Sequence, residues 1–454
     1  MPKSFFATLM FSAVAVIANA ADAPDRVREF VEPYLKEKQI PGCAIMVRKD
    51  GKTVHCAGYG IANLEHNVPV TTETVFQSGS IGKQFTAMAI MLLVKDGKLA
   101  LDDAVSKYLN VPKTWSDITV RHVLNHTSGL GDYPETFSLQ RDYSEDELLK
   151  MVVAQPLSFE PGSKWEYSNL GYVTLGILIH KVSGQSYGDF LKKQIFWPLG
   201  MKNSRIISEE QIIPHRAAGY RLKNGALKNQ EWVAPSVNTT ADGSLYLTAE
   251  DIAKWDQALE EEKLISHDAY VEMWNSVKLN DGGAAPYSFG WGITQTRSGH
   301  RLLEHGGAWQ GFAAYIARYP DDHLSVAVFC NRAGASPRYV GQRVAALFVP
   351  ELAPAVHSAA QLSKTTLESY ASDYRMGDRF TIHVNAVGDH LETTWLGEKI
   401  IMMPESESAF YEPDSDRTFR VVKDNRGNVT ALIISVPEEL TLRRIQAGPV
   451  KTER

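Results

Sequence analysis

Cysteine is scarce in this chain, and the spacing of its cysteines argues against a metal site. Cys43, Cys56 and Cys330 are the only cysteines among 454 residues. Three cysteines allow at most one internal disulfide. None of them lies at the short separation that zinc-binding cysteine pairs require. We therefore expect no metal bound by these cysteines.

A predicted β-hairpin decides how two of these cysteines face each other. Cys43 and Cys56 lie on the two arms of the segment "GCAIMVRKDGKTVHCAGYG", which turns at Asp50-Gly51, and this is typical of a hairpin. In that register Cys56 would face Ile45, and Cys43 would be its diagonal neighbour, usually too distant for a disulfide. We expect three buried free thiols, and a Cys43–Cys56 disulfide is the alternative.

An excess of positive charge is also missing. The formal net charge is −6, and lysine and arginine form no long run. A protein that binds nucleic acid through phosphates needs a basic surface, as does a polybasic membrane anchor. The charge pattern therefore disfavours nucleic acid and anionic membranes as partners.

Long apolar runs are missing except near the N-terminus. Lys3 precedes an apolar run, Phe5–Ala18, that is too short to span a bilayer, and small residues follow it up to Ala20. This order is typical of an export signal cleaved after Ala20. We expect residues 1–20 to be removed, leaving a periplasmic or secreted protein without a membrane span. A retained anchor is the alternative.

The order of predicted elements indicates an α+β catalytic domain at residues 21–350. An amphipathic helix and the hairpin come first, followed by an apolar helix over 80–97 and a helix-rich region from about 101 to 200. Strand patterns return from about 285, and a helix closes the segment near 349. This order predicts an antiparallel sheet flanked by helices, with strands from both ends of the segment and an all-helical lobe inserted between them.

A change in the sequence pattern marks a second domain. The stretch "VPELAPAVHS", residues 349–358, looks like a linker, which we place at residues 351–359. Residues 360–454 consist of short alternating segments broken by turns. About 95 residues of this kind predict a small antiparallel barrel.

The first chemical signal lies at the start of the apolar helix, in "SGSIGKQFTAMAIMLLV", residues 78–94. Ser80 and Lys83 are three residues apart and would share one face near the helix start. Burial and the positive end of the helix dipole both favour a neutral amine. A downward pKa shift of about 3 units would make Lys83 a base for the Ser80 hydroxyl. Alternatively, Ser80 caps the helix and Lys83 reaches the surface.

Two further motifs could complete a catalytic site. Tyr167 and Asn169 lie in a loop rich in proline and glycine that leads into an apolar helix, a setting that suits the rim of a cleft. The segment His305-Gly306-Gly307 interrupts a strand pattern with glycines. Glycines of this kind occur where a ligand or another backbone approaches closely.

Taken in order, S-x-x-K at Ser80, Y-x-N at Tyr167 and H-x-G at His305 resemble the motifs of the penicillin-recognising serine hydrolases. The resemblance is to the branch with class C β-lactamases, D,D-peptidases, D-aminopeptidases and esterases, and it covers roughly residues 25–350. The stretches "ITVRHVLNHTSGL" and "ADGSLYLTAEDIAKW" are also similar to that branch. Residues 360–454 resemble the lipocalin-like barrels of some D-aminopeptidase relatives.

The resemblance implies a role for each motif residue. Ser80 would be the nucleophile, Lys83 its base, alone or with Tyr167, and Tyr167 the proton shuttle to the leaving group. His305 would orient the Tyr167 phenol or the substrate. The substrate-binding set would be Asn169, Gly306, Gly307 and Ala308; within it, Asn169 would bind a substrate amide and the Ala308 N–H would complete an oxyanion hole with Ser80.

One position departs from the family pattern. The middle residue of the third motif is usually threonine or serine, whose hydroxyl would bind a substrate carboxylate, and Gly306 has none. This disfavours β-lactams and D-Ala-D-Ala carboxypeptidase substrates, which carry that carboxylate.

Two other patterns suggest chemistry but fit structural roles better. Ser186 lies in a G-x-S-x-G sequence, but a helix precedes it where a nucleophile elbow needs a strand, so we expect a helix cap. His122 and His126 are four apart but lack the glutamate of H-E-x-x-H, so we expect structural roles and no metal.

The sequence therefore predicts an exported serine hydrolase that acts through an acyl-enzyme on peptide or amide bonds, without a metal or organic cofactor. The expected substrates are D-amino-acid peptides. A carboxylesterase and a class C-like β-lactamase are the alternatives, followed by a non-catalytic binder of peptidoglycan fragments. The expected partner is a small peptide, amide or ester substrate; the oligomeric state stays open.

Overall fold

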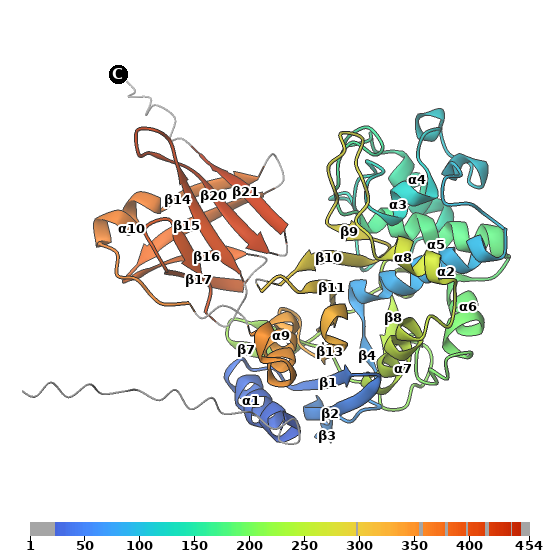
Figure 1. Cartoon of the computed structure of the whole chain (residues 1–454), viewed down its shortest axis with the longest axis horizontal. Helices are drawn as coiled ribbons and strands as arrows, with labels where there is room; N and C mark the ends of the chain where they lie inside the picture. Colours follow the sequence, from blue (N-terminus) through green and yellow to red (C-terminus); the bar gives the residue numbers. More distant parts are fainter. Residues whose placement is uncertain are drawn as a thin grey trace, which may run out of the picture.

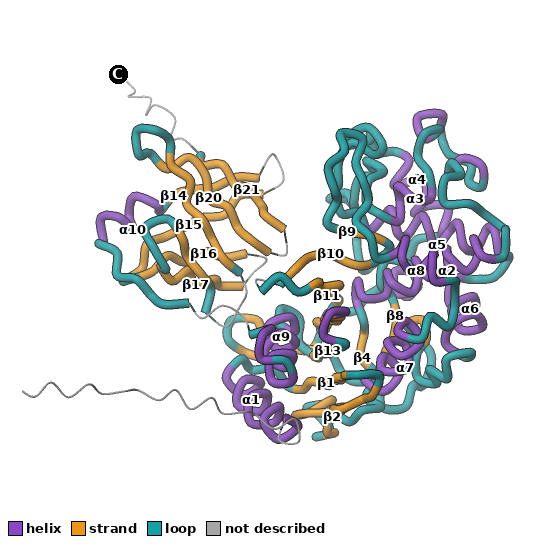
Figure 2. Tube along the Cα trace, in the orientation of Figure 1, coloured by secondary structure: helices purple, strands orange, loops and turns teal. Residues whose placement is uncertain are grey.

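The protein consists of a helix-flanked sheet and a separate barrel (Figure 1). The computed structural model describes residues 23–296, 298–353, 357–376, 380–395, 398–413, 417–436 and 438–445. The predicted export signal, residues 1–20, lies outside the described residues. Figure 2 shows the strands gathered in the central sheet and the barrel, with most helices on the far side of the sheet from the barrel.

The central sheet has eight antiparallel strands in the order β3-β2-β1-β13-β12-β11-β10-β9. Its N-terminal and C-terminal halves meet where β1 pairs with β13, so the predicted sheet, with strands from both ends of the domain, is confirmed. The strands are β1 (Gly42–Lys49), β2 (Lys52–Asn63), β3 (Val68–Pro69), β9 (Tyr287–Ser288), β10 (Trp291–Gln295), β11 (Arg301–Trp309), β12 (Phe312–Tyr319) and β13 (Leu324–Cys330).

Both faces of this sheet are buried, and helices cover each of them. Cys43, Ile45 and Val47 of β1 pack into the cluster under α1 (Ala23–Glu37) and α9 (Pro337–Phe348). Ala44 and Met46 point the other way, into the larger core. Because successive strand residues alternate between faces, β1 contributes side chains to two separate cores. The larger core contains α2 (Lys83–Lys95), α7 (Ala249–Glu260) and α8 (His267–Met273).

The predicted hairpin forms, but its register differs by one residue. Asp50 and Gly51 turn with positive φ values of 50° and 76°. A β-bulge near Val47 places Cys56 opposite Met46 instead of Ile45. One extra residue in one strand moves every later side chain to the other face.

The bulge separates the two cysteines that the hairpin was expected to bring together. Cys43 and Cys56 lie on opposite faces of the sheet, which rules out a bridge between them. All three cysteines are free thiols, as expected. Cys43 and Cys330 are buried, but Cys56 is partly exposed, so the expected burial is wrong for Cys56. Cys43 instead pairs directly with Cys330 across β1 and β13.

A helical lobe is inserted between the two halves of the sheet. It contains α3 (Val120–Leu124), α4 (Glu145–Val153), α5 (Asn169–Ser183) and α6 (Tyr187–Leu191). Small strands lie on both sides of the lobe in the sequence: β4 (Phe76–Gln77), β5 (Arg205–Ile206) and β8 (Leu245–Leu247) form one sheet, and β6 (Tyr220–Lys223) and β7 (Ala226–Asn229) form another. No helix within the described ranges is long and apolar enough to cross a bilayer.

The C-terminal segment forms the predicted closed antiparallel barrel, with its own apolar core. The helix α10 (Lys364–Tyr370) packs into this core through Leu367 and Tyr370. The barrel strands are β14 (Ser372–Met376), β15 (Phe380–Val387), β16 (His390–Trp395), β17 (Glu398–Pro404), β18 (Ala409–Tyr411), β19 (Thr418–Lys423), β20 (Val429–Val436) and β21 (Glu438–Arg444).

Candidate active site

Ser80 and Lys83 meet at the entrance to the buried helix α2. Ser80 lies in a 3₁₀ turn, Gly79–Gly82, and Lys83 is the first residue of α2, three residues later than the predicted helix start. Residues three apart eclipse each other in 3₁₀ geometry. Lys83 Nζ is 3.2 Å from Ser80 Oγ.

Lys83 is fully buried, and its surroundings favour an uncharged amine. Nζ lies 2.8 Å from Asn169 Oδ1 and 2.5 Å from the Asp242 carbonyl oxygen. Burial lowers the pKa of Lys83 from 10.5 to about 8, although the charges of Asp242 and Asp132 oppose the shift. A neutral amine has two N–H donors and one lone pair. If the donors serve these two acceptors, the lone pair faces the Ser80 hydroxyl.

Asn169 is the first residue of α5 and is held between Lys83 and Asp132. Its Nδ2 donates to Asp132 Oδ2 at 3.0 Å, and its backbone N–H donates to Asp132 Oδ1 at 3.2 Å. The Ser168 side chain caps the helix by accepting the Gly171 N–H. The amide oxygen of Asn169 therefore faces the lysine, and the expected contact with a substrate amide stays a prediction.

Tyr167 stands over Lys83, and its environment opposes ionisation. Lys83 Nζ is 4.8 Å from the centre of the Tyr167 ring. Burial raises the pKa of Tyr167 well above 10, although a hydrogen bond with the Ser80 hydroxyl works in the opposite direction. Near neutral pH Tyr167 is thus a phenol that can give a proton, whereas Lys83 can accept one.

His305 contacts Tyr287, a residue that belongs to none of the three sequence motifs. The Tyr287 hydroxyl is 2.9 Å from His305 Nε2, and His305 Nδ1 is 2.6 Å from the Gly306 carbonyl oxygen. A carbonyl only accepts, so Nδ1 carries the proton and Nε2 accepts from the Tyr287 hydroxyl. Burial, with the nearby Lys83, lowers the pKa of His305 to about 4.

The contact with Tyr287 concerns the expected role of His305, which was to orient the Tyr167 phenol or the substrate. The centres of the His305 and Tyr167 rings are 6.1 Å apart. Tyr287, rather than Tyr167, is the phenol that shares a hydrogen bond with the imidazole. A neutral His305 fixed in one tautomer presents an uncharged wall to the cleft.

The edge of β11 beside Ser80 is open. Pairing between β10 and β11 ends at Glu304, whereas pairing with β12 continues to Trp309. A Cβ on Gly307 would lie 2.0 Å from the Ser78 carbonyl oxygen, so only glycine lets β11 approach the nucleophile turn this closely. A Cβ on Gly306 would meet nothing within 4 Å.

The backbone N–H of Ala308 lies close to the turn that carries Ser80. A Cβ on Gly79 would lie 2.4 Å from the Ala308 nitrogen, and Gly79 has φ = +52°. This tight fit brings the N–H groups of Ser80 and Ala308 into one neighbourhood, as an oxyanion hole requires.

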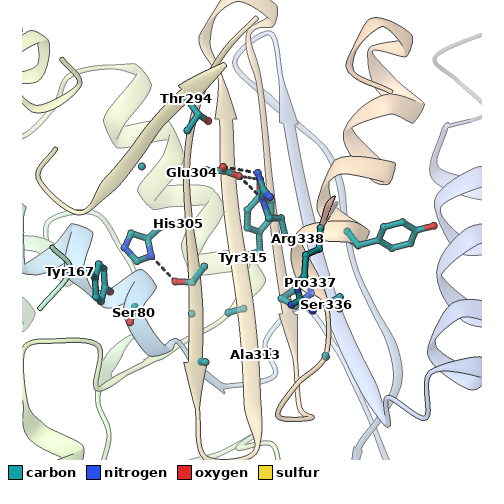
Figure 3. Close-up of a pocket in the computed structure, with 18 of the residues that line it drawn as sticks. Ser80, Tyr167, Thr294, Glu304, His305, Ala313, Tyr315, Ser336, Pro337 and Arg338 are labelled. Atoms are coloured by element: carbon teal, nitrogen blue, oxygen red, sulfur yellow. Dashed lines mark hydrogen bonds and ion pairs between the residues drawn. The ribbon is translucent and has the colours of Figure 1, made fainter. Parts of the chain in front are cut away.

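A cavity of about 530 Å³ joins these residues to both faces of β11 (Figure 3). On one face it is lined by Ser80, Tyr167 and His305. On the other face the Glu304 carboxylate is held by the Tyr315 hydroxyl at 2.5 Å and by Arg338 at 2.9 and 3.0 Å. Arg417, which precedes β19 of the barrel, also lines this cavity. The volume suits a ligand larger than a single amino acid.

His126 has a closer connection with the site than the sequence suggested. Its ring centre is 4.3 Å from that of Tyr167 and 4.6 Å from that of Tyr287. Its Nδ1 accepts the Ser168 N–H at 3.1 Å, and its backbone has φ = +58°. The hydrogen bond from Ser168 connects the loop at His126 to the residue next to Tyr167. In the sequence, only the Thr127-Ser128-Gly129 segment indicated a turn after His126.

The other expected structural roles are confirmed. His122 completes a capping box with Thr119 at the start of α3. Ser186 caps α6 by accepting the Asp189 N–H. No group of three or more histidine, cysteine, aspartate or glutamate side chains in the described part of the chain could hold a metal ion.

Comparisons with known proteins agree with this geometry. The family model described as Beta-lactamase matches residues 27–349. Penicillin-binding protein 4* of Bacillus subtilis is 29% identical over 405 residues, which span 83% of this chain and 89% of that protein. The D-aminopeptidase of Gluconobacter oxydans is 29% identical over 320 residues, 67% of this chain, but only 58% of that enzyme's length is matched.

A solved structure extends the likeness to the barrel. The octameric penicillin-binding protein homologue from Pyrococcus abyssi superposes with a TM-score of 0.69 at 27% identity. The superposition covers 92% of this chain and 99% of that protein. The similarity therefore includes the C-terminal part as well as the helix-flanked sheet.

Proposed function

The chain belongs to the beta-lactamase family and is a serine hydrolase, and we propose that it cleaves amide bonds of small D-amino-acid peptides through an acyl-enzyme. The observation that carries the proposal is the buried amine of Lys83, 3.2 Å from Ser80 Oγ. Its lowered pKa, about 8, leaves a useful fraction of the amine unprotonated near neutral pH. Likeness to the Gluconobacter D-aminopeptidase supports the substrate class.

Acylation would begin with proton transfer from Ser80 to Lys83. Ser80 Oγ then attacks the substrate carbonyl, and the N–H groups of Ser80 and Ala308 bind the developing oxyanion. Tyr167, kept as a phenol by burial, gives its proton to the leaving amine. A water molecule then attacks the acyl-enzyme: Tyr167 takes its proton back from the water, and Lys83 returns a proton to Ser80. Because Lys83 and Tyr167 interact, their titrations are those of a pair.

Asn169 and His305 would act by holding other groups in place. Asn169 orients the Lys83 amine through Oδ1 and is itself fixed by Asp132. His305, held by Tyr287, shapes the wall of the cleft near the substrate. Gly306 and Gly307 would leave room for the substrate backbone along the open edge of β11.

The glycine at position 306 favours substrates without a carboxylate near the cleaved bond. Space beside Gly306 is open, and glycine itself has no hydroxyl with which to bind a carboxylate. This supports aminopeptidase and amidase chemistry over β-lactam hydrolysis. A carboxylesterase with the same residues is the second candidate, because an ester needs the same nucleophile and a less demanding leaving group.

A substrate panel tests the proposal. D-alanine and D-phenylalanine p-nitroanilides, their L-isomers, p-nitrophenyl acetate and nitrocefin should be compared, with Ser80→Ala as the blank. We expect the D-anilides to give the highest kcat/KM. Turnover of the ester alone would make the chain a carboxylesterase, and preferential turnover of nitrocefin would make it a β-lactamase.

We also propose that residues 1–20 direct export to the periplasm or beyond and that residues 351–359 link the catalytic domain, 21–350, to a lipocalin-like barrel, 360–454. The small-residue sequence before Ala20 supports cleavage there. N-terminal sequencing of protein from the cell envelope or the medium should begin at Ala21. Full-length protein in the cytoplasm would contradict export.

A further inference from the structure

A second cavity, of about 330 Å³, lies at the opposite end of the same strands. It is bounded by α7, α8, the start of β11 and the end of β12. Ser80, Tyr167 and His305 do not line it. The two cavities share no lining residue, so this cavity is separate from the active-site cleft.

Its floor is a buried row of charges on the sheet. Arg48 and Arg318 flank Ser325 across β1, β13 and β12. Asp256 of α7 lies between the two guanidinium groups, with Oδ2 3.0 Å from Arg48 Nε and Oδ1 2.9 Å from Arg318 Nε. Glu260 also binds Arg48, at 2.8 Å. Arg48 is thus neutralised, whereas Arg318 shares one carboxylate.

Arg318 keeps its terminal amino groups available to the cavity. Within the described residues the Arg318 side chain makes no hydrogen bond, and its ion pair with Asp256 runs through Nε. The guanidinium carbon lies 5.0 Å from the centre of the Trp274 ring, and the side chain is only 11% exposed. The aspartate and the indole hold the group in one orientation, so little entropy would be lost on binding an anion.

A second guanidinium lies beside it. Arg301 precedes Leu303 by two residues on the same face of β11, and Leu303 pairs directly with Arg318. Arg301 donates to the Trp274 carbonyl oxygen. No carboxylate of the described residues pairs with its side chain. The remaining acid lining the cavity, Glu262, is bound to His267 at 2.8 Å.

We propose that this cavity binds a small organic oxyanion, a carboxylate or a phosphate monoester, between Arg301 and Arg318. Paired guanidinium groups suit the planar or tetrahedral oxygens of such groups. The volume exceeds what an inorganic anion needs and lies at the lower end of small-molecule sites. Leu303 and Val271 supply apolar surface for the organic part.

Calorimetric titration of the full chain in Tris chloride tests the proposal. The probes are succinate and phenyl phosphate, with succinamide as the uncharged control. We expect a Kd below about 1 mM for at least one anion. Succinate binding more tightly would identify a carboxylate site, and phenyl phosphate binding more tightly would identify a phosphate monoester site.

Substitutions locate the binding. Arg301→Gln and Arg318→Gln should each weaken the anion at least about tenfold, and Arg426→Gln in an exposed barrel turn should not. Arg301 forms no ion pair with the described residues, so its variant should fold even if Arg318→Gln does not. Binding that both variants retain, or no heat from either anion up to about 10 mM, would overturn the proposal.

Discussion

Replacing Lys83 with methionine should remove activity and at the same time change how stability depends on pH. Methionine has a similar length and no charge, so it can occupy the same buried space. The native lysine carries a cost at neutral pH, because burial lowers its pKa from 10.5 to about 8. Protonating this amine is easier in the unfolded chain than in the folded protein.

The two pKa values set the size and the sign of the effect. A difference of 2.5 units corresponds to a destabilisation of about 3 kcal/mol below pH 8. The unfolded chain binds more protons between pH 8 and 10.5, so wild-type stability should rise across that window. The cost should fall to about 2 kcal/mol at pH 9 and about 1 kcal/mol at pH 10.

Urea unfolding of wild type and Lys83→Met between about pH 7 and pH 10 measures this difference. The variant also loses the hydrogen bonds to Asn169 and Asp242, but that loss does not vary with pH. Lys95→Met removes an exposed lysine from the other end of α2 and is the matched control. A stability difference between wild type and Lys83→Met that stays constant with pH would refute a desolvated lysine.

Three further outcomes follow from the site. The kcat/KM should rise with pH through about 8 and then level off as Lys83 loses its proton; a pH profile that is flat from pH 6 to 9 would exclude Lys83 as the base. Gly306→Ala should keep the melting temperature near that of wild type and should lower kcat/KM much less than Gly307→Ala does. For Gly307→Ala we expect a loss of at least about a hundredfold, because its methyl would meet the Ser78 carbonyl; equal effects of the two would contradict the close approach of β11. Tyr287→Phe removes the donor to His305 and should lower kcat/KM about threefold to tenfold without changing the melting temperature; unchanged kinetics would show that the contact is dispensable.

The sequence was sufficient for the sheet, the barrel and the pairing of Ser80 with Lys83. These rest on local patterns: alternation in strands, an apolar helix, and a spacing of three residues that brings two side chains together. The motifs at Tyr167 and His305 were found through resemblance to a family, and folding brings both beside Ser80.

The remaining site residues depend on contacts between distant segments. Asp132 lies in a loop and Tyr287 in the two-residue strand β9, and neither segment has a distinctive local pattern, yet the two residues contact Asn169 and His305. The bulge near Val47 that moved Cys56 to the other face is a single-residue irregularity. The local sequence pattern predicts helices and strands, but it carries no sign of a contact between distant segments or of one extra residue in a strand.

Covalent labelling tests the central claim, that the buried Lys83 amine makes Ser80 a nucleophile. Wild type and Lys83→Met should be treated with a fluorophosphonate, digested, and examined by mass spectrometry. We expect the adduct on Ser80 and labelling at least about a hundredfold slower in the variant. An adduct on another serine, or equally fast labelling of the variant, would contradict the account.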